Sequence, residues 1–263
     1  MRLLAFTKPF GRIDAPLLAE TVASVGADGA DLLVREGQTV GPADPAGIAA
    51  VAAELGRRGL TLDVVTTDLL DAGADADRLI AACGESGVPL VRVGFYRYDP
   101  AAGYRRLLEE SRAALARLHG LAARHGVNLA LQLHHGTIHP SASLALALAG
   151  DLNDVRFYAD PGNQAKEGSE AWALNVDLLG DRMACMGVKN AVWRSAADGW
   201  VCEWQPFADG GVVPWPEILP GLRARGYTGA LSLHVHYPAA DPVAAVRRDL
   251  GHLRRLLPGA AGA

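Results

Sequence analysis

The sequence predicts a single-domain (β/α)₈ TIM barrel over residues 1–263, and three observations lead to this fold class. Short β-like runs alternate with longer alanine- and leucine-rich helical runs along the chain, as in repeated βα units around a parallel sheet. The length of 263 residues and the 50% hydrophobic content suit one α/β barrel with one large core. No glycine-rich phosphate fingerprint follows any strand, which disfavours an open doubly wound sheet.

The expected elements follow from runs of β-branched or apolar residues and from helical periodicity. Eight strands are predicted, at Leu3–Thr7, Ala30–Val34, Thr61–Thr66, Leu90–Val93, Asn128–Leu133, Val155–Ala159, Ala184–Lys189 and Ala230–Val235. Helical stretches between them include Asp14–Val25, Pro45–Arg58, Asp75–Glu85, Tyr104–His125 and Asp241–Leu257.

Glycines mark the connections from helix to strand. A glycine closely follows a helical run at Gly26, Gly59, Gly87, Gly126 and Gly226. This placement is typical of a helix C-cap, where the left-handed conformation strains glycine least. Connections from strand to helix vary more, and Ala191–Pro214 is the longest variable loop. In a barrel these loops lie on the catalytic face, so we expect the site at the carboxyl ends of the strands.

Composition excludes several classes of partner and location. A formal net charge of −4 without a run of lysines and arginines argues against nucleic acid as the main partner. The cysteines Cys83, Cys185 and Cys202 show no CxxC spacing, so we expect neither a disulfide framework nor a cysteine zinc site. The first residues are too short an apolar stretch for a signal peptide, and no run has transmembrane length. We expect a cytoplasmic protein without a membrane partner.

Polar side chains gather at the predicted strand ends. The segment from Leu129 to Gly136 places Gln132 and His134 on one face of a strand, because side chains alternate between faces. Later strands end at Asp160, at Lys189, and at His234 and His236. Such a ring of side chains at one end of a barrel predicts an active site.

Cations and aromatic residues add candidates for substrate binding. Lys8, Arg35, Arg97 and Lys189 lie at strand ends, where they could hold a phosphate or carboxylate or stabilise an enediolate. Aromatic residues crowd two loops, and Tyr96 and Trp193 are candidates for packing on a sugar ring. Ordinary loop packing or a subunit interface explains these aromatics equally well, so a homo-oligomer stays open.

The chain resembles the xylose isomerase-like barrels, the superfamily of sugar phosphate isomerases and epimerases. The resemblance rests on five blocks: Phe6–Pro9, Gly29–Arg35, Arg92–Asp99, Gly211–Leu219 followed by Gly226-Tyr227, and Ser232–Pro238. These blocks are spread over most of the chain. They are specific for the family and less specific for the substrate.

The resemblance implies a divalent metal held by Glu, Asp, His and Glu on strands five to eight, with the two Glu as acid and base. These positions fall on Gln132, Asp160, Gly187 and His234, so only the aspartate is unaltered. A glutamine cannot ionise and is a weak neutral ligand. The remaining metal candidates are Asp160, His234, Gln132 and His134, a nitrogen-rich set that suits Zn²⁺, Mn²⁺, Co²⁺ or Fe²⁺ better than Mg²⁺.

Two functions follow from these expectations. The leading hypothesis is an enzyme that moves a proton next to a carbonyl of a carbohydrate-like small molecule, by isomerisation, epimerisation or elimination. His234, His134 or Lys189 would carry the proton, and Lys8, Arg35, Arg97, Tyr96, Trp193 and His236 would bind the substrate. The alternative is a barrel that binds a sugar or sugar acid without turning it over, because the ligand set is degenerate.

Overall fold

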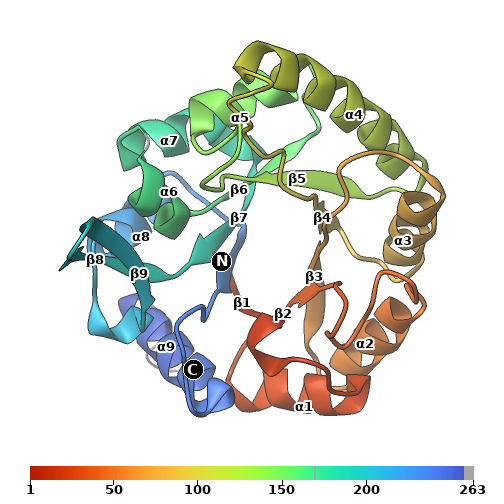
Figure 1. The fold of residues 1–263 in the computed structure, drawn as a ribbon. Coiled ribbons are helices and arrows are strands. Elements are labelled where there is room, and N and C mark those ends of the chain that lie inside the picture. The colour runs from red at the N-terminus through yellow and green to blue at the C-terminus, as the bar shows by residue number, and fades with distance from the viewer. Residues whose placement is uncertain (169, 258–263) are drawn as a thin grey trace.

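Eight parallel strands close into a barrel surrounded by helices in the computed structural model, which describes residues 1–168 and 170–257 (Figure 1). The barrel strands are β1 (Arg2–Phe6), β2 (Gly29–Leu33), β3 (Thr61–Thr66), β4 (Leu90–Arg92), β5 (Asn128–Gln132), β6 (Arg156–Ala159), β7 (Met183–Val188) and β10 (Ala230–Leu233). Each pairs with its neighbours in the sequence, and β10 closes the ring between β7 and β1. The predicted fold class is confirmed.

The surrounding helices bury one apolar face against the strands. They are α1 (Ala15–Ser24), α2 (Gly47–Gly56), α3 (Ala74–Glu85), α4 (Tyr104–Arg124), α5 (Ala142–Ala149), α6 (Pro161–Glu167), α7 (Trp172–Leu179), α8 (Trp215–Ala224) and α9 (Pro242–Leu256), with short 3-10 turns at Lys8–Phe10, Gly180–Arg182 and Phe207–Asp209. In α4, Leu115, Leu118 and Leu121 are buried at a spacing of three residues, which places them on one side of the helix.

The glycines predicted as helix C-caps have the expected left-handed backbone. Gly26, Gly59, Gly87, Gly126 and Gly226 have φ between 69° and 77°. Other residues rarely adopt this conformation, because their Cβ atom would be strained there. The connections from helix to strand are therefore tight, and the freedom to build a site is left to the opposite end of the barrel.

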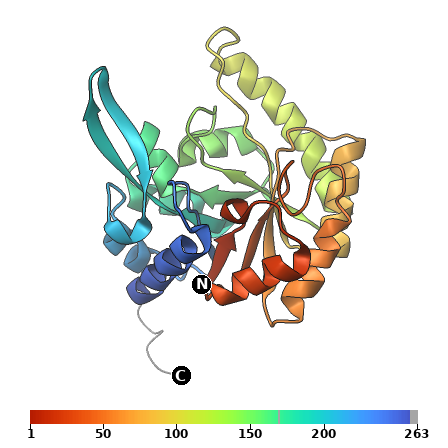
Figure 2. The same ribbon diagram turned by 60° about the horizontal axis from the view of Figure 1, so that its bottom comes forward.

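Most of the long segment after β7 is a hairpin, which corrects the expectation of a loop over Ala191–Pro214; only its end, from Pro206, is a 3-10 turn and loop. β8 (Asn190–Ala196) pairs in antiparallel fashion with β9 (Gly199–Gln205). The segment also contains glycines and aromatic residues, which are common in loops, and these made the two strands hard to recognise in the sequence. Figure 2 shows the hairpin projecting from the barrel on the same side as the loop before α4, at the carboxyl ends of the strands.

The cysteine thiols and the lengths of the helices are two further features of the fold. Cys83, Cys185 and Cys202 are free thiols. Burial raises the pKa of Cys83 to about 12, so that thiol stays protonated at neutral pH. Within residues 1–168 and 170–257, every helix is too short or too polar to cross a bilayer.

Candidate active site

Side chains that point into the barrel change from apolar to polar along the strands. The apolar layer is one buried cluster of Leu4, Val64, Leu90, Ala130, Tyr158, Cys185 and Ala230. Two positions further along the same strands or just beyond their ends come Phe6, Thr66, Arg92, Gln132, Asp160, Gly187 and Ser232. Because side chains alternate along a strand, these residues share the inward face and form the floor of a site.

Asp160 and Lys189 form a buried ion pair at this floor. Asp160 is fully buried, and its Oδ2 atom accepts hydrogen bonds from Gln132 Nε2 at 2.7 Å and Lys189 Nζ at 3.0 Å. Its Oδ1 atom caps α6 by accepting from the backbone N–H of Asn163 at 3.0 Å. The Asn163 Oδ1 atom accepts from Lys189 Nζ at 2.8 Å. The carboxylate and the ammonium therefore hold each other in place.

Two glycines leave the space that this ion pair occupies. A Cβ atom at Gly162 would lie 2.5 Å from Lys189 Cγ, and one at Gly187 would lie 2.9 Å from Asp160 Oδ2. Both distances are shorter than van der Waals contact, so a larger residue at either position would displace the pair. Glycine at 162 and 187 thus lets the Lys189 side chain lie across the start of α6.

A second buried carboxylate, Asp31, lies in a network of hydroxyl groups. Its Oδ1 atom accepts from Thr66 at 2.7 Å, and its Oδ2 atom accepts from Tyr158 at 2.8 Å and Ser232 at 2.9 Å. Since the single Tyr158 hydroxyl proton goes to Asp31, the Tyr158 oxygen accepts from His234 Nε2 at 2.8 Å. Burial raises the pKa of Asp31, but the contacts with His234, Thr66 and Tyr158 outweigh it and lower the value.

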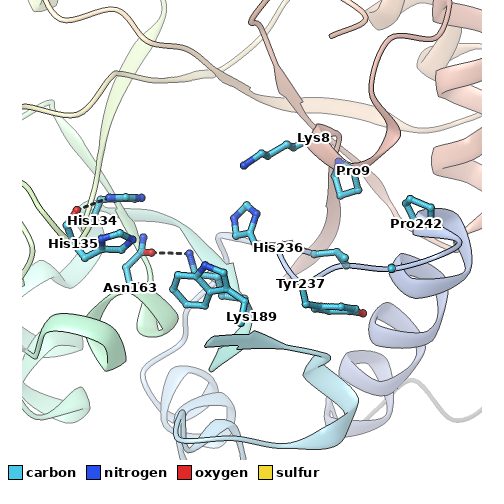
Figure 3. Close-up of a pocket in the computed structure, with 12 residues that line it drawn as sticks. Lys8, Pro9, His134, His135, Asn163, Lys189, His236, Tyr237 and Pro242 are labelled. Atoms are coloured by element: carbon cyan, nitrogen blue, oxygen red, sulfur yellow. Dashed lines mark hydrogen bonds between the residues drawn. The ribbon is translucent and has the colours of Figure 1, made fainter. Parts of the chain in front are cut away.

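Two adjoining cavities open above this floor. The outer cavity has a volume of about 410 Å³ and is lined by His135 and Tyr237, among others (Figure 3). Trp204 also lines it. The inner cavity, of about 100 Å³, reaches down to Thr66, Arg92 and Gln132. Four residues line both cavities and therefore stand at their junction: Lys8, His134, Lys189 and His236.

The imidazoles at the junction are neutral at physiological pH. Burial lowers the pKa of His134 to about 2, with a smaller contribution from the nearby Lys189 charge. Burial and then Lys189 lower the pKa of His236 well below 6.5. His134 Nδ1 donates to the carbonyl of His135 at 2.7 Å, so its Nε2 carries the lone pair, and in Figure 3 that end of the ring points away from the His135 carbonyl into the cavity.

The metal ligands expected from the sequence do not fit a divalent cation. Gln132 turns its amide N–H group toward Asp160, and the Lys189 ammonium holds the same carboxylate oxygen. His234 Nε2 is bonded to Tyr158, and His134 Nδ1 is bonded to a backbone carbonyl. Within the described residues no group of three or more His, Cys, Asp or Glu side chains is placed to hold a metal. The cationic partner of Asp160 is a lysine.

Protein purified without chelator is therefore expected to contain much less than one equivalent of any divalent metal. Elemental analysis measures this directly. The melting temperature should change by less than about 1 °C on adding EDTA, Mn²⁺ or Zn²⁺, because a ligand that binds the folded state would raise it. One equivalent of metal that EDTA removes with a fall in melting temperature would contradict this arrangement.

Three of the six predicted substrate-binding residues lie at the cavities. Lys8 and His236 line both cavities, and Arg35 lines the inner one. Arg35 also pairs with Asp68 through two hydrogen bonds of 2.8 and 2.6 Å. Figure 3 shows the Lys8 amino group and the His236 ring projecting into the same space from the ends of β1 and β10.

The other three predicted residues lie outside the walls of both cavities. The buried Tyr96 hydroxyl donates to a backbone carbonyl of the loop after β3 at 2.8 Å. Arg97 covers the ring of Phe95, with 5.1 Å from its Cζ to the ring centroid. Trp193 Nε1 donates to the backbone carbonyl of Ala165 in α6 at 3.1 Å. All three side chains pack within or against loops. For Tyr96 and Trp193 this matches the alternative of ordinary loop packing.

Trp204 is one of the aromatic residues that crowd the segment after β7. It faces the outer cavity from β9, and Lys189 Nζ lies 4.6 Å from the centroid of its ring. Two functional candidates, Arg92 and Asp31, were missed in the sequence. Arg92 and Asp31 are almost fully buried on β4 and β2. A charged residue inside an apolar strand is rarely buried without a partner, so their place in these strands is the signal that could have found them.

Comparison with known proteins places the fold in a family. The model of the xylose isomerase-like TIM barrel family matches residues 19–256. No curated protein sequence matches this chain. A 3-keto-D-glucoside 4-epimerase from E. coli has a similar structure, with TM-score 0.76 and 17% identity over 97% of this chain and 99% of that one. Such identity supports the fold alone.

Two further solved structures are similar at comparable identity. One is a probable 3-DHS dehydratase from Bacillus anthracis, with TM-score 0.78 and 15% identity over 96% of this chain and 98% of that one. The other is a xylose isomerase-like TIM barrel protein from Mycobacterium smegmatis in complex with magnesium, with TM-score 0.72 and 18% identity over 99% of this chain and 98% of that one. With the family model matching most of its length, the chain belongs to the xylose isomerase-like TIM barrel family.

Proposed function

We propose that this protein is an isomerase or epimerase that moves a proton next to the carbonyl group of a carbohydrate-like small molecule. The observation that carries the proposal is the buried Lys189 ammonium, which is fixed by Asp160 and Asn163 at the junction of the two cavities. Sugar epimerases and a dehydratase among the structural neighbours support the same class of chemistry.

Lys189 can stabilise the negative oxygen that forms in such a reaction. The ammonium has three N–H donors, of which Asp160 and Asn163 accept two. The third is left for a substrate oxygen in a site where Lys189 is 4% exposed, and a fixed charge acts strongly where water is excluded. The ring of Trp204 beside the ammonium adds a flat face for the substrate.

His134 is the best placed proton acceptor. Burial and the nearby cations make its neutral Nε2 a weak base in the free protein, and negative charge on the bound substrate raises that pKa. Nε2 then takes a proton from carbon as the C–H bond electrons move toward the carbonyl carbon and the carbonyl oxygen becomes an enediolate.

Return of the proton from the His134 imidazolium to the neighbouring carbon gives an isomer. An epimer needs a proton from the other face of the same carbon, and the Lys189 ammonium, which lines the same junction, can supply it. His236 lines the junction as well, but it is neutral and binds the substrate. His234 is less well placed, because it lines only the inner cavity. Its Nε2 is bonded to Tyr158, and its Nδ1 is buried without a partner.

Exchange of carbon-bound hydrogen in ²H₂O tests the proposal without knowledge of the product. Ketoses, sugar phosphates and sugar acids are incubated with the protein, and loss of the proton next to the carbonyl is followed by NMR. We expect exchange with at least one of them. His134→Gln should lower the rate by about a hundredfold or more, the usual size of general-base catalysis.

A histidine outside both cavities supplies the matched control. His119 lies on the outer helix α4, so His119→Gln should leave the rate unchanged. Full exchange activity in His134→Gln would reject that residue as the base. Saturable sugar binding without exchange across the panel would instead support a non-catalytic binding barrel.

A further inference from the structure

The inner cavity is strongly cationic. Lys8, Arg35, Arg92 and Lys189 line it, and no described residue in its wall is acidic. Asp68 balances Arg35, and Asp160 balances Lys189. Arg92 forms no salt bridge with any described residue, and the buried Asp31 carboxylate offsets its charge only from beyond salt-bridge distance. The distribution of charge therefore favours an anion in this space.

Arg92 is the least satisfied of these cations. Only 3% of the residue is exposed. Its Nε donates to Thr66 Oγ1 at 3.2 Å and its Nη2 donates to the carbonyl of Thr67 at 3.1 Å, whereas the buried Nη1 has no hydrogen-bond partner. The ring of Phe95 covers the guanidinium, with its centroid 4.6 Å from Cζ. A buried guanidinium with a free N–H pair is costly unless a ligand accepts from it.

Repulsion among the cations points to the same ligand. Burial lowers the pKa of Lys189, and the charges of Lys8 and Arg92 lower it further. Burial and the Arg35 charge likewise lower the pKa of Lys8. A bound anion would relieve this repulsion. It would also favour protonation of His134, which the Lys189 and Arg92 charges oppose.

We propose that the inner cavity binds the anionic group of the substrate, a phosphoryl or carboxylate group, with Arg92 at its base and Lys8 at its rim. A volume of about 100 Å³ accommodates such a group but not a sugar ring, so the body of the molecule lies in the outer cavity beside Trp204. Since Lys189 and His134 line both cavities, the reacting carbonyl is close along the substrate to the anionic group. The identification of this molecule as a substrate rests on the proposed function, whereas the binding of an anion in the inner cavity does not.

Calorimetry with orthophosphate and with matched pairs of sugars tests the proposal. Ribose 5-phosphate and gluconate carry the two candidate anions, and ribose and glucose are their neutral counterparts. We expect orthophosphate and at least one sugar anion to bind, with affinity at least tenfold above the neutral sugars. Tighter binding of ribose 5-phosphate assigns a phosphoryl group, and tighter binding of gluconate assigns a carboxylate.

Variants locate the bound anion. Arg92→Met should weaken orthophosphate binding about tenfold or more, and Lys8→Gln should weaken it several-fold. Lys8 is exposed, so Lys8→Gln remains informative if Arg92→Met does not fold. Arg78→Gln, at a surface ion pair on α3, is the control and should leave orthophosphate binding unchanged.

Equal binding of neutral sugars and anions would overturn the proposal. Unchanged orthophosphate binding in Lys8→Gln and in any folded Arg92→Met would overturn it as well. Hydrogen exchange on a neutral ketose without anion binding would overturn it while leaving the proposed function standing.

Discussion

Lys189→Met is expected to lower the free energy of unfolding by about 3–5 kcal/mol. The Lys189 side chain is 4% exposed and the Asp160 side chain is fully buried, so the variant leaves a carboxylate in the core without its counterion. Methionine fills a similar volume, and the loss is therefore electrostatic more than steric. Denaturation by urea or guanidinium chloride, with linear extrapolation to water, measures the change.

The double variant Asp160→Asn with Lys189→Met supplies the control. Asparagine at 160 keeps the helix cap toward Asn163, because its side-chain oxygen still accepts that N–H. With both charges removed, most of the stability should return, since an isolated buried charge is far more costly than a neutral pair. A cost below 1 kcal/mol for Lys189→Met, or additive costs in the double variant, would show that the pair is not coupled as described.

The sequence predicted the barrel and the end at which the site lies, because both depend on local patterns. Period-two alternation within a strand brings Gln132, Asp160 and Lys189 to one floor whatever the loops do. The sequence does not predict which side chains of that floor form hydrogen bonds with one another. Whether Lys189 or a metal holds Asp160 depends on the clearance that Gly162, at the start of α6, and Gly187, on β7, leave around the two side chains.

The loop residues were less predictable for a different reason. Tyr96, Trp193 and Trp204 are all aromatic residues in loops or hairpins after a strand, and composition does not say which side of the loop each one faces. The pairing of β8 with β9 puts Trp193 and Trp204 on the same face of the hairpin, because Trp193 is opposite Cys202 and Trp204 is opposite Ala191. Trp204 lies nearer the base of the hairpin and lines the outer cavity, whereas the Trp193 indole, further along, bonds to α6. Composition does not give this difference in position. His234 lines the inner cavity, as its place at a strand end predicts, but its role depends on Tyr158 and Asp31.

Acidification is expected to unfold the protein well before its carboxylates are protonated. Burial is the main cause that lowers the pKa of five histidines: His134 to about 2, His135 and His139 to about 4, and His234 and His236 in the same direction. In the unfolded chain each takes up a proton near pH 6.5. Between the two values the unfolded state binds more protons, so stability is fully present above about pH 6.5 and falls as the pH drops.

The free energy of unfolding is expected to fall steeply as the pH drops. Each such histidine removes up to about 1.4 kcal/mol per pH unit, so His134 and His139 together remove up to about 3 kcal/mol per unit, against a typical total of about 5–15 kcal/mol. His234 and His236 act in the same direction, and the half-buried His135 contributes less because solvent screens it. His139 alone, which is fully buried, accounts for about 3 kcal/mol by pH 4. Guanidinium denaturation at pH 7.5, 6.5, 5.5 and 5.0 should show a free energy of unfolding that is level at first and then falls steeply.

His139→Gln separates this effect from other consequences of acid. His139 lies outside the walls of both cavities, and its removal should reduce the slope by about one proton, or 1.4 kcal/mol per pH unit, below pH 6. Any packing defect that the substitution introduces shifts the free energy of unfolding equally at every pH and leaves the slope unaltered. His119→Gln on α4 should keep the original slope. A free energy of unfolding that stays constant from pH 7.5 to 5.0 would mean that the buried imidazoles take up protons in the folded protein as readily as in the unfolded chain. Their assignment as neutral proton acceptors would then be wrong.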